Sequence, residues 1–238
     1  MSGPYRRLLV TRPGEDGRAL AALVEARGAT ALIDPMLEIE HHAGPPLDLA
    51  GAQALLFTSA NGVRAAAART SERSLPAFAV GDATARAARA AGFADVRSAG
   101  GDVGDLTALV ARSLVPGAGR LVHAAGTAVA GDLGAALAAA GFVVERAVLY
   151  AARPAASLAE STVRELYAGT IDAVLFFSPR TARSFVRLAG QAGLDARLVA
   201  VDALCLSTAV AMEARTMPWH AIRVAERPEQ ATLLDLLR

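Results

Sequence analysis

The sequence predicts an α/β protein built from two doubly wound parallel-sheet domains that are related by internal duplication and joined by a two-stranded linker. Three observations predict this class. Short apolar runs alternate with segments of helical period, glycine ends several of these segments, and four stretches of the first half recur in the second. Nearly continuous apolar strands, each followed by a helix, are typical of parallel sheets that are covered on both faces.

The strand and helix signals alternate along the chain. Glycine at positions 28, 92 and 141 suits the left-handed conformation that commonly ends a helix. The predicted pairs are strand 8–10 with a helix ending at residue 28, strand 54–57 with helix 61–69, strand 77–80 with a helix ending at residue 92, strand 121–122 with a helix ending at residue 141, and strand 173–177 with the helix that follows it.

An internal repeat predicts how these units are divided between domains. Residues 57–61 resemble 176–180, residues 83–87 resemble 207–211, residues 105–109 resemble 231–235, and residues 10–28 resemble 122–141. The copy of the opening unit follows the other three units of the first half, so the opening unit belongs with the second half of the chain. We therefore expect a discontinuous domain of residues 1–36 plus 154–238, a continuous domain of residues 43–146, and linker strands at 37–42 and 147–153. Two such connections predict a cleft and hinge motion.

Composition excludes several classes of function. The net charge is +1, which gives no electrostatic reason to expect nucleic acid or an anionic membrane as a partner. Every basic residue is arginine, so neither a Schiff-base lysine nor the lysine of a phosphate-binding P-loop is present. A nucleotide-dependent enzyme is disfavoured further because residues 100–104, Gly-Gly-Asp-Val-Gly, lack the spacing of a dinucleotide-binding loop.

Cysteine and histidine give no sign of a metal or cofactor. Cys205 is the single cysteine and lies in an apolar run, which favours a buried thiol over a nucleophile. The four histidines have no metal-ligand spacing, so we expect no metal and no cofactor. The first seven residues lack the apolar core of a signal peptide, and polar residues interrupt the longest apolar stretches. These features predict a soluble cytoplasmic protein without a membrane partner.

Small polar residues cluster at four predicted strand-to-helix turns. Unpaired backbone N–H groups and the helix dipole favour anions at such turns, and ligands bind at the carboxyl ends of strands in doubly wound sheets. Ser, Thr and Asn are also ordinary helix caps, so each turn alone has two interpretations. The candidate residues are Thr58, Ser59, Asn61, Thr84, Ser178, Ser207 and Thr208.

Taken in order, these motifs resemble those of the uroporphyrinogen-III synthase family along nearly the whole chain. The matching segments are Val10–Pro13, Phe57–Val63, Val80–Ala85, Val148–Tyr150, Phe176–Pro179 and Ser207–Ala209. The family's discontinuous two-domain topology agrees with the order of the repeat. The chain departs from the family at Cys205, where glycine is usual, and at Ala125, where an Arg-Gly pair commonly begins.

The resemblance implies a cofactor-free, cyclising hydro-lyase of haem biosynthesis that acts as a monomer. Its substrate would be hydroxymethylbilane, a linear tetrapyrrole polycarboxylate, which it would close to uroporphyrinogen III with loss of water and inversion of ring D. Tyr150 would donate a proton to the departing hydroxyl, although an aromatic residue packed on a linker strand is the alternative. Arg12 and the small polar residues of the turns would bind substrate.

Two other functions stay open at this stage. One is a non-catalytic two-lobe protein that closes on a small anion, which would share the duplication and the hinge. The other is an inactive paralogue of the synthase, because Cys205 and Ala125 depart from the family pattern.

Overall fold

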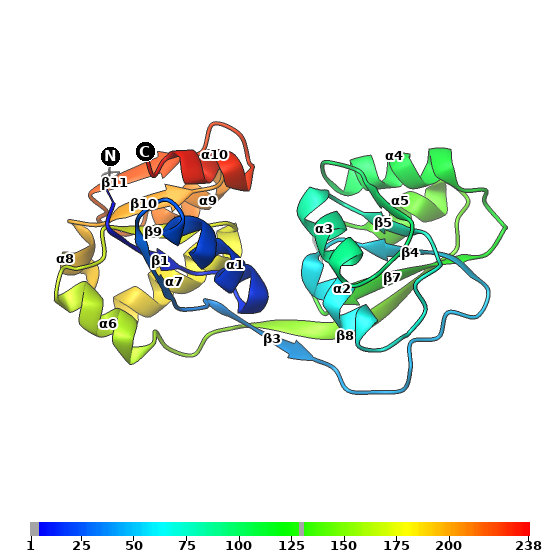
Figure 1. Ribbon diagram of the computed structural model, residues 1–238, viewed down its shortest axis with the longest axis horizontal. Coiled ribbons are helices and arrows are strands. Elements are labelled where there is room, and N and C mark those ends of the chain that lie inside the picture. Colours follow the sequence, from blue (N-terminus) through cyan, green and yellow to red (C-terminus); the bar gives the residue numbers. More distant parts are fainter. Residues whose placement is uncertain (1–4, 129–130) are drawn as a thin grey trace. The chain divides into compact units, whose positions relative to one another are not determined.

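The computed structural model describes residues 5–128 and 131–238, so residues 1–4 of the expected first domain lie outside it. The chain divides into two compact units, drawn in Figure 1. Unit 1 comprises Met1–Glu38 and Arg153–Arg238, and unit 2 comprises Ile39–Ala152. Each unit has its own sheet, and the predicted α/β class with predominantly parallel sheets is confirmed.

Unit 1 contains a five-stranded parallel sheet in the order β2-β1-β9-β10-β11. Its core lies on both faces, with Phe176, Phe185 and Trp219 in mutual ring contact on one face and Leu8 and Leu233 on the other. The strands are β1 Arg7–Val10, β2 Thr30–Ile33, β9 Ala173–Phe176, β10 Asp202–Cys205 and β11 Ala221–Val224, and the helices are α1 Gly14–Glu25, α6 Glu160–Tyr167, α7 Pro179–Gln191, α8 Asp195–Leu198, α9 Thr208–Ala214 and α10 Gln230–Asp235.

Unit 2 is built around a six-stranded sheet in the order β3-β8-β7-β4-β5-β6, in which the strands from β8 to β6 are parallel. Phe57 and Phe78 are fully buried on its two faces. The strands are β3 Leu37–His41, β4 Ala52–Phe57, β5 Ala77–Ala79, β6 Val96–Ser98, β7 Arg120–Gly126 and β8 Val144–Pro154, and the helices are α2 Ala60–Ala67, α3 Asp82–Ala90, α4 Val103–Ser113 and α5 Leu133–Ala139.

The edge strand β3 runs opposite to β8. The backbone N–H of His42 donates to the Leu149 carbonyl at 2.8 Å, and that of Ala155 donates to the Met36 carbonyl at 3.1 Å. Because the partner's residue number falls as the first one rises, the two segments are antiparallel.

The two sheets share one strand order. Numbered along the chain, the strands of unit 1 lie in the order 2-1-3-4-5. If counting in unit 2 starts at β7, continues to β8 and then returns to β4, β5 and β6, the order is again 2-1-3-4-5. Sheets of this order bind ligands beside the first and third strands, at the carboxyl edge. A ligand site is therefore expected at the ends of β7 and β4 in unit 2, and at the ends of β1 and β9 in unit 1.

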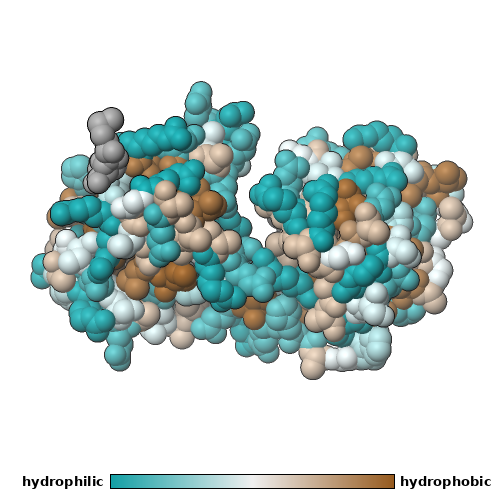
Figure 2. Space-filling view, viewed as in Figure 1, coloured by the Kyte–Doolittle hydropathy of each residue, from teal (hydrophilic) through white to brown (hydrophobic). Residues whose placement is uncertain are grey.

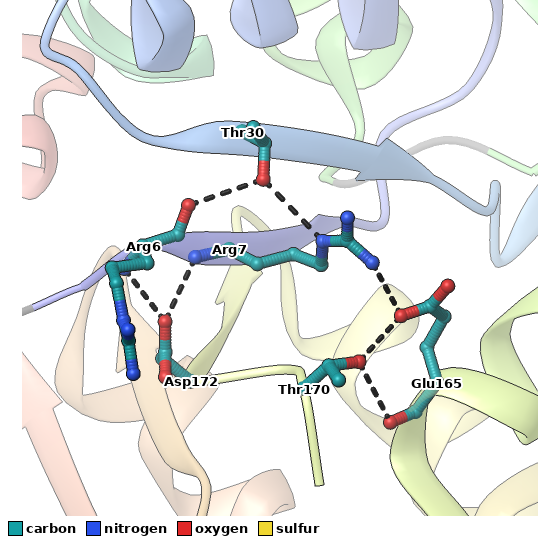
Figure 3. Close-up of polar contacts among 6 residues, drawn as sticks. All are labelled: Arg6, Arg7, Thr30, Glu165, Thr170 and Asp172. Carbon is teal, nitrogen blue, oxygen red and sulfur yellow. Dashed lines mark hydrogen bonds and ion pairs between the residues drawn. The ribbon is translucent and has the colours of Figure 1, made fainter. Parts of the chain in front are cut away.

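The opposite, amino-terminal edge of the unit 1 sheet is closed by side chains (Figure 3). The Asp172 carboxylate accepts the backbone N–H groups of Arg6 and Arg7 at 2.6 and 2.8 Å, and Arg7 forms an ion pair with Glu165 of α6. The Thr30 hydroxyl donates to the Arg6 carbonyl at 3.1 Å. These contacts join β1, β2, β9 and α6 at this edge.

Hydrophilic residues cover much of the face of each unit drawn in Figure 2, with hydrophobic residues gathered in patches between them. Exposed apolar residues such as Val115 and Val143 are normal for a globular surface. Within the described ranges, none of the helices combines the length and apolar character needed to cross a bilayer.

Candidate active site

The carboxyl edge of the unit 2 sheet holds a pocket of about 330 Å³. Five segments supply its wall: the turn after β4, the residue after β5, the start of α4, the loop after β7, and β8 itself. Its lining residues are Thr58, Ser59, Val80, Asp102, Val103, Ala128 and Tyr150. This is the position at which a sheet of this strand order leaves room for a ligand, because the connections from β7 and β4 diverge there.

A pair of hydroxyl groups lies in the wall of this pocket. The Ser59 Oγ is 2.7 Å from the Tyr150 Oη, although the two residues are far apart in sequence. Ser59 also caps α2, where its Oγ accepts the backbone N–H of Gly62 at 3.1 Å. Because that oxygen accepts from the helix, its own hydrogen can be donated to Tyr150. The phenol hydrogen of Tyr150 is then free to point toward a ligand.

Backbone geometry holds the Tyr150 ring against β7. The register of β7 and β8 shifts between the pairs Ala125–Val148 and Gly126–Tyr150, which leaves one extra residue on β8. A β carbon at Gly126 would lie 2.8 Å from Cζ of the Tyr150 ring, closer than side chains approach. The Thr127 N–H donates to the Tyr150 carbonyl at 2.9 Å. Bulges commonly redirect side chains beside active sites, and here the bulge and the glycine together fix the phenol.

A second polar pair supports the same wall. The Thr58 Oγ1 lies 3.0 Å from Nε2 of His123, a buried residue of β7. Burial lowers the pKa of His123 to about 4, and the positive charge of Arg146 acts in the same direction. Arg146 also donates to the carbonyls of Gly126 and Thr127 at 2.6 and 2.8 Å, so it holds the loop at the pocket rim.

The site includes residues that sequence reasoning missed. Asp102 caps α4 and accepts the backbone N–H groups of Gly104 and Asp105, at 2.8 and 3.1 Å. In the sequence, the Gly-Gly-Asp segment that contains Asp102 resembles only a nucleotide motif with the wrong spacing, and His123 has no metal-ligand spacing. A useful signal was present in each case: a polar residue beside a predicted strand end, or within an apolar strand.

The other two candidate residues of unit 2 lie outside the pocket lining. The Asn61 side chain accepts from Arg64 at 3.0 Å within α2. Thr84 is the third residue of α3 and is buried, and the cap of that helix is Gly81, which has no side chain to contribute. These contacts do not test whether Asn61 and Thr84 bind the substrate, so substrate binding by both residues stays a prediction.

The candidate residues of unit 1 lie at the carboxyl edge of its own sheet. Arg12 follows β1, where its guanidinium lies 4.7 Å from the centre of the Phe177 ring and donates to Gln230 at 3.0 Å. Ser178 caps α7 by accepting the N–H of Thr181 at 3.2 Å. Ser207 caps α9, and Thr208, its first residue, is exposed. Ser178 and Ser207 therefore cap their helices, and substrate binding by the four candidate residues of unit 1 stays a prediction.

Cys205 does not distort the turn that it precedes. It ends β10, is fully buried as predicted, and burial raises the pKa of its thiol to about 12. Among the described residues, positive φ angles occur only at glycines, so the departure from glycine at this position carries no backbone strain. No group of three His, Cys, Asp or Glu residues in the described ranges is arranged to hold a metal ion.

Comparisons with known proteins agree on one family. The family model described as Uroporphyrinogen-III synthase HemD matches residues 18–235. The chain is similar to the crystal structure of uroporphyrinogen-III synthetase from Helicobacter pylori, with 18% identity, a TM-score of 0.62, and coverage of 98% of this chain and 97% of that one. It is also similar to a mutant uroporphyrinogen III synthase from Thermus thermophilus, with 21% identity, a TM-score of 0.51, and 97% coverage of both chains. A search of curated proteins found no match. The family model covers most of the sequence, and the chain therefore belongs to the uroporphyrinogen-III synthase family.

Proposed function

We propose that the pocket of unit 2 is where this cyclising lyase acts on the reacting end of hydroxymethylbilane. The reaction of the family removes the terminal hydroxyl as water, which gives an electrophilic azafulvene. Ring D is attacked through its substituted carbon, and the resulting spiro intermediate fragments and closes with ring D inverted. The observation that carries the proposal is the Ser59–Tyr150 hydroxyl pair in the wall of a pocket at the carboxyl edge of the sheet.

In this proposal Tyr150 is the proton donor to the departing hydroxyl. Its phenol carries an O–H group, which can be donated to the departing oxygen. Donation from Ser59 to Tyr150 orients the phenol hydrogen outward and stabilises negative charge that develops on the phenol oxygen. The leaving group then departs as water rather than as hydroxide.

The rest of the task is to hold a flexible polyanion in one folded shape. Without the enzyme, hydroxymethylbilane closes uninverted, so control of conformation matters more than any single catalytic group. Backbone N–H groups at the start of α2, with Thr58 and Asn61, would bind carboxylates near the pocket. We propose the same role for Thr84 and, in unit 1, for Arg12, Ser178, Ser207 and Thr208.

We also propose that the two units descend from one duplicated ancestor. The shared 2-1-3-4-5 strand order supports this, because it pairs β1 with β7 and β9 with β4, as the sequence repeat does. On this view β3 and β8, which are hydrogen-bonded neighbours, serve as the linker strands. The domains would be residues 1–36 plus 154–238 and residues 43–146. We propose further that the enzyme works as a monomer in the cytoplasm.

The decisive experiment is a coupled assay in which hydroxymethylbilane is generated in place and the type I and type III products are separated. We expect type III product to form in proportion to enzyme concentration. Type I product alone, at the rate seen without enzyme, would instead support an inactive paralogue. Tyr150→Phe in the same assay tests the placement of the chemistry in the unit 2 pocket.

A further inference from the structure

We propose that His123 is a positioning residue for the reaction, because it fixes the hydroxyl of Thr58 in the pocket wall. The inference rests on the proposed function, since it assigns a role within the same pocket. His123 itself does not line the pocket, whereas Thr58 does. His123 would therefore act on the substrate only through Thr58.

The register of the sheet brings the two residues together. His123 of β7 lies opposite Leu56 of β4, and Thr58 follows two residues after Leu56, just beyond the end of that strand. Residues 56 and 58 would share a face by strand alternation, so Thr58 projects toward the side on which His123 lies. The resulting contact of 3.0 Å between Nε2 and Oγ1 is a normal hydrogen-bond distance.

His123 suits this role because it stays neutral. Its side chain is buried, and Arg146 on the neighbouring strand pairs with it in register, so protonation would place two cations side by side. Burial, with Arg146 second, lowers the pKa to about 4. A neutral imidazole makes one bond to the hydroxyl in either tautomer. The remaining hydrogen or lone pairs of Thr58 are then left for the ligand.

A buried histidine could also have a purely structural role, packing beside Leu121 in a strand. The geometry argues for more than packing, since an apolar residue would fill that space without a desolvated polar atom. The hydrogen bond converts a freely rotating hydroxyl at the pocket wall into one with a fixed direction. That fixed direction is what a site needs if it selects one folded form of a flexible substrate.

The test is a double-mutant cycle on the rate of type III formation, using Thr58→Val, His123→Phe and the two combined. We expect each single substitution to lower kcat/KM by about 3- to 10-fold, as for loss of one hydrogen bond. The double variant should be no slower than the slower single variant. His123→Gln, which keeps a polar group near the Nε2 position, should recover most of the loss. His41→Gln, at an exposed residue of β3, should keep the wild-type rate.

Three outcomes would overturn the inference: losses that multiply in the double variant, glutamine no better than phenylalanine, or wild-type rates in His123→Phe. Unfolding temperatures identify any variant that has simply lost its fold. If His123→Phe does not fold, His123→Leu, which also lacks a polar atom, takes its place in the cycle with Thr58→Val. A loss in Tyr150→Phe without coupling between Thr58 and His123 refutes this inference alone. Absence of type III product from the wild-type protein refutes the proposed function.

Discussion

The two units share a strand order but use the carboxyl edges of their sheets differently. In unit 2 the ends of β4 and β7 border a pocket, and Ser59 and Tyr150 contribute hydroxyl groups to its wall. In unit 1 the corresponding ends of β9 and β1 carry Phe177 and Arg12, which stack on each other. The comparison teaches that a common architecture fixes where a site can form, whereas the side chains decide which chemical groups that place presents.

A buried polar cluster lies at the other edge of the unit 1 sheet. Asp202, buried at the start of β10, accepts hydrogen bonds from Tyr5 at 2.6 Å and Arg223 at 3.1 Å, and its other oxygen lies 2.8 Å from His220 Nδ1. Burial alone would raise the pKa of Asp202, but these partners outweigh it and the net shift is downward. Satisfied polar groups of this kind stabilise a fold, whereas the hydroxyls of unit 2 retain capacity for a ligand.

The largest effect on activity is expected from Gly126→Ala. The added β carbon would lie 2.8 Å from the Tyr150 ring, and the atoms it meets belong to the far end of a side chain, so the ring moves and the fold survives. A displacement of about 1 Å at a reacting group costs roughly 100-fold in rate. Initial rates of type III formation check this. Gly134→Ala in α5, where the new carbon would meet only Asp132 at 3.5 Å, should keep the wild-type rate, and equal losses in both would refute the explanation.

Two tyrosines provide the next contrast. Tyr150→Phe removes the hydroxyl of the unit 2 pocket and should slow type III formation by roughly 5- to 100-fold, as for loss of a hydrogen bond to a developing leaving group. Tyr5→Phe removes the hydroxyl bound to Asp202 in unit 1. It should leave the rate unchanged and lower the unfolding temperature by about 2 to 4 °C. A full rate in Tyr150→Phe would remove this residue from the mechanism.

The low pKa of His123 predicts a loss of stability in acid. The unfolded chain binds a proton near its ordinary pKa of 6.5, whereas the folded protein does so only near 4. The free energy of unfolding is therefore highest above pH 6.5, falls as the pH drops toward 4, and then levels off, with a total loss of about 3 kcal/mol. Urea unfolding between pH 7 and about 4 measures it. His123→Gln should flatten this part of the profile, and an unchanged slope would contradict the assignment.

Much of the architecture could be predicted from the sequence, and each exception has a physical cause. Buried strands such as β4 and β9 appear as apolar runs because both of their faces are covered. The edge or half-exposed strands β2, β6 and β11 were not predicted, since partial exposure removes the apolar signal. Strand β7 was predicted at residues 121–122 but spans Arg120–Gly126, because His123 and three small residues hide its continuation.

Residues of the candidate site could be predicted from the sequence only where they directly follow a predicted strand. Thr58 and Ser59 are adjacent in sequence, and their place at a predicted strand-to-helix turn was enough to nominate them. The contacts of Thr58 with His123 and of Gly126 with Tyr150 depend on the register of neighbouring strands and on a bulge in β8. Sequence periodicity does not encode register between distant strands, so these partners required the structure.

The smallest effects are expected from the two serine caps, which separate capping from catalysis. Ser59 and Ser178 each accept a backbone N–H at the start of a helix, at 3.1 and 3.2 Å. Replacement by alanine should therefore cost each unit a similar stability, about 1 kcal/mol, measured by urea unfolding. Only Ser59 also contacts Tyr150, so Ser59→Ala should slow type III formation by about 3- to 10-fold, while Ser178→Ala should slow it less than about 3-fold.

If many donors share the binding of a polyanion, no single one of them is indispensable. Equal rate losses in both variants would show that the carboxyl edge of unit 1 contributes as much as that of unit 2. Complete loss in a folded Ser178→Ala would show that the chemistry depends on unit 1 instead.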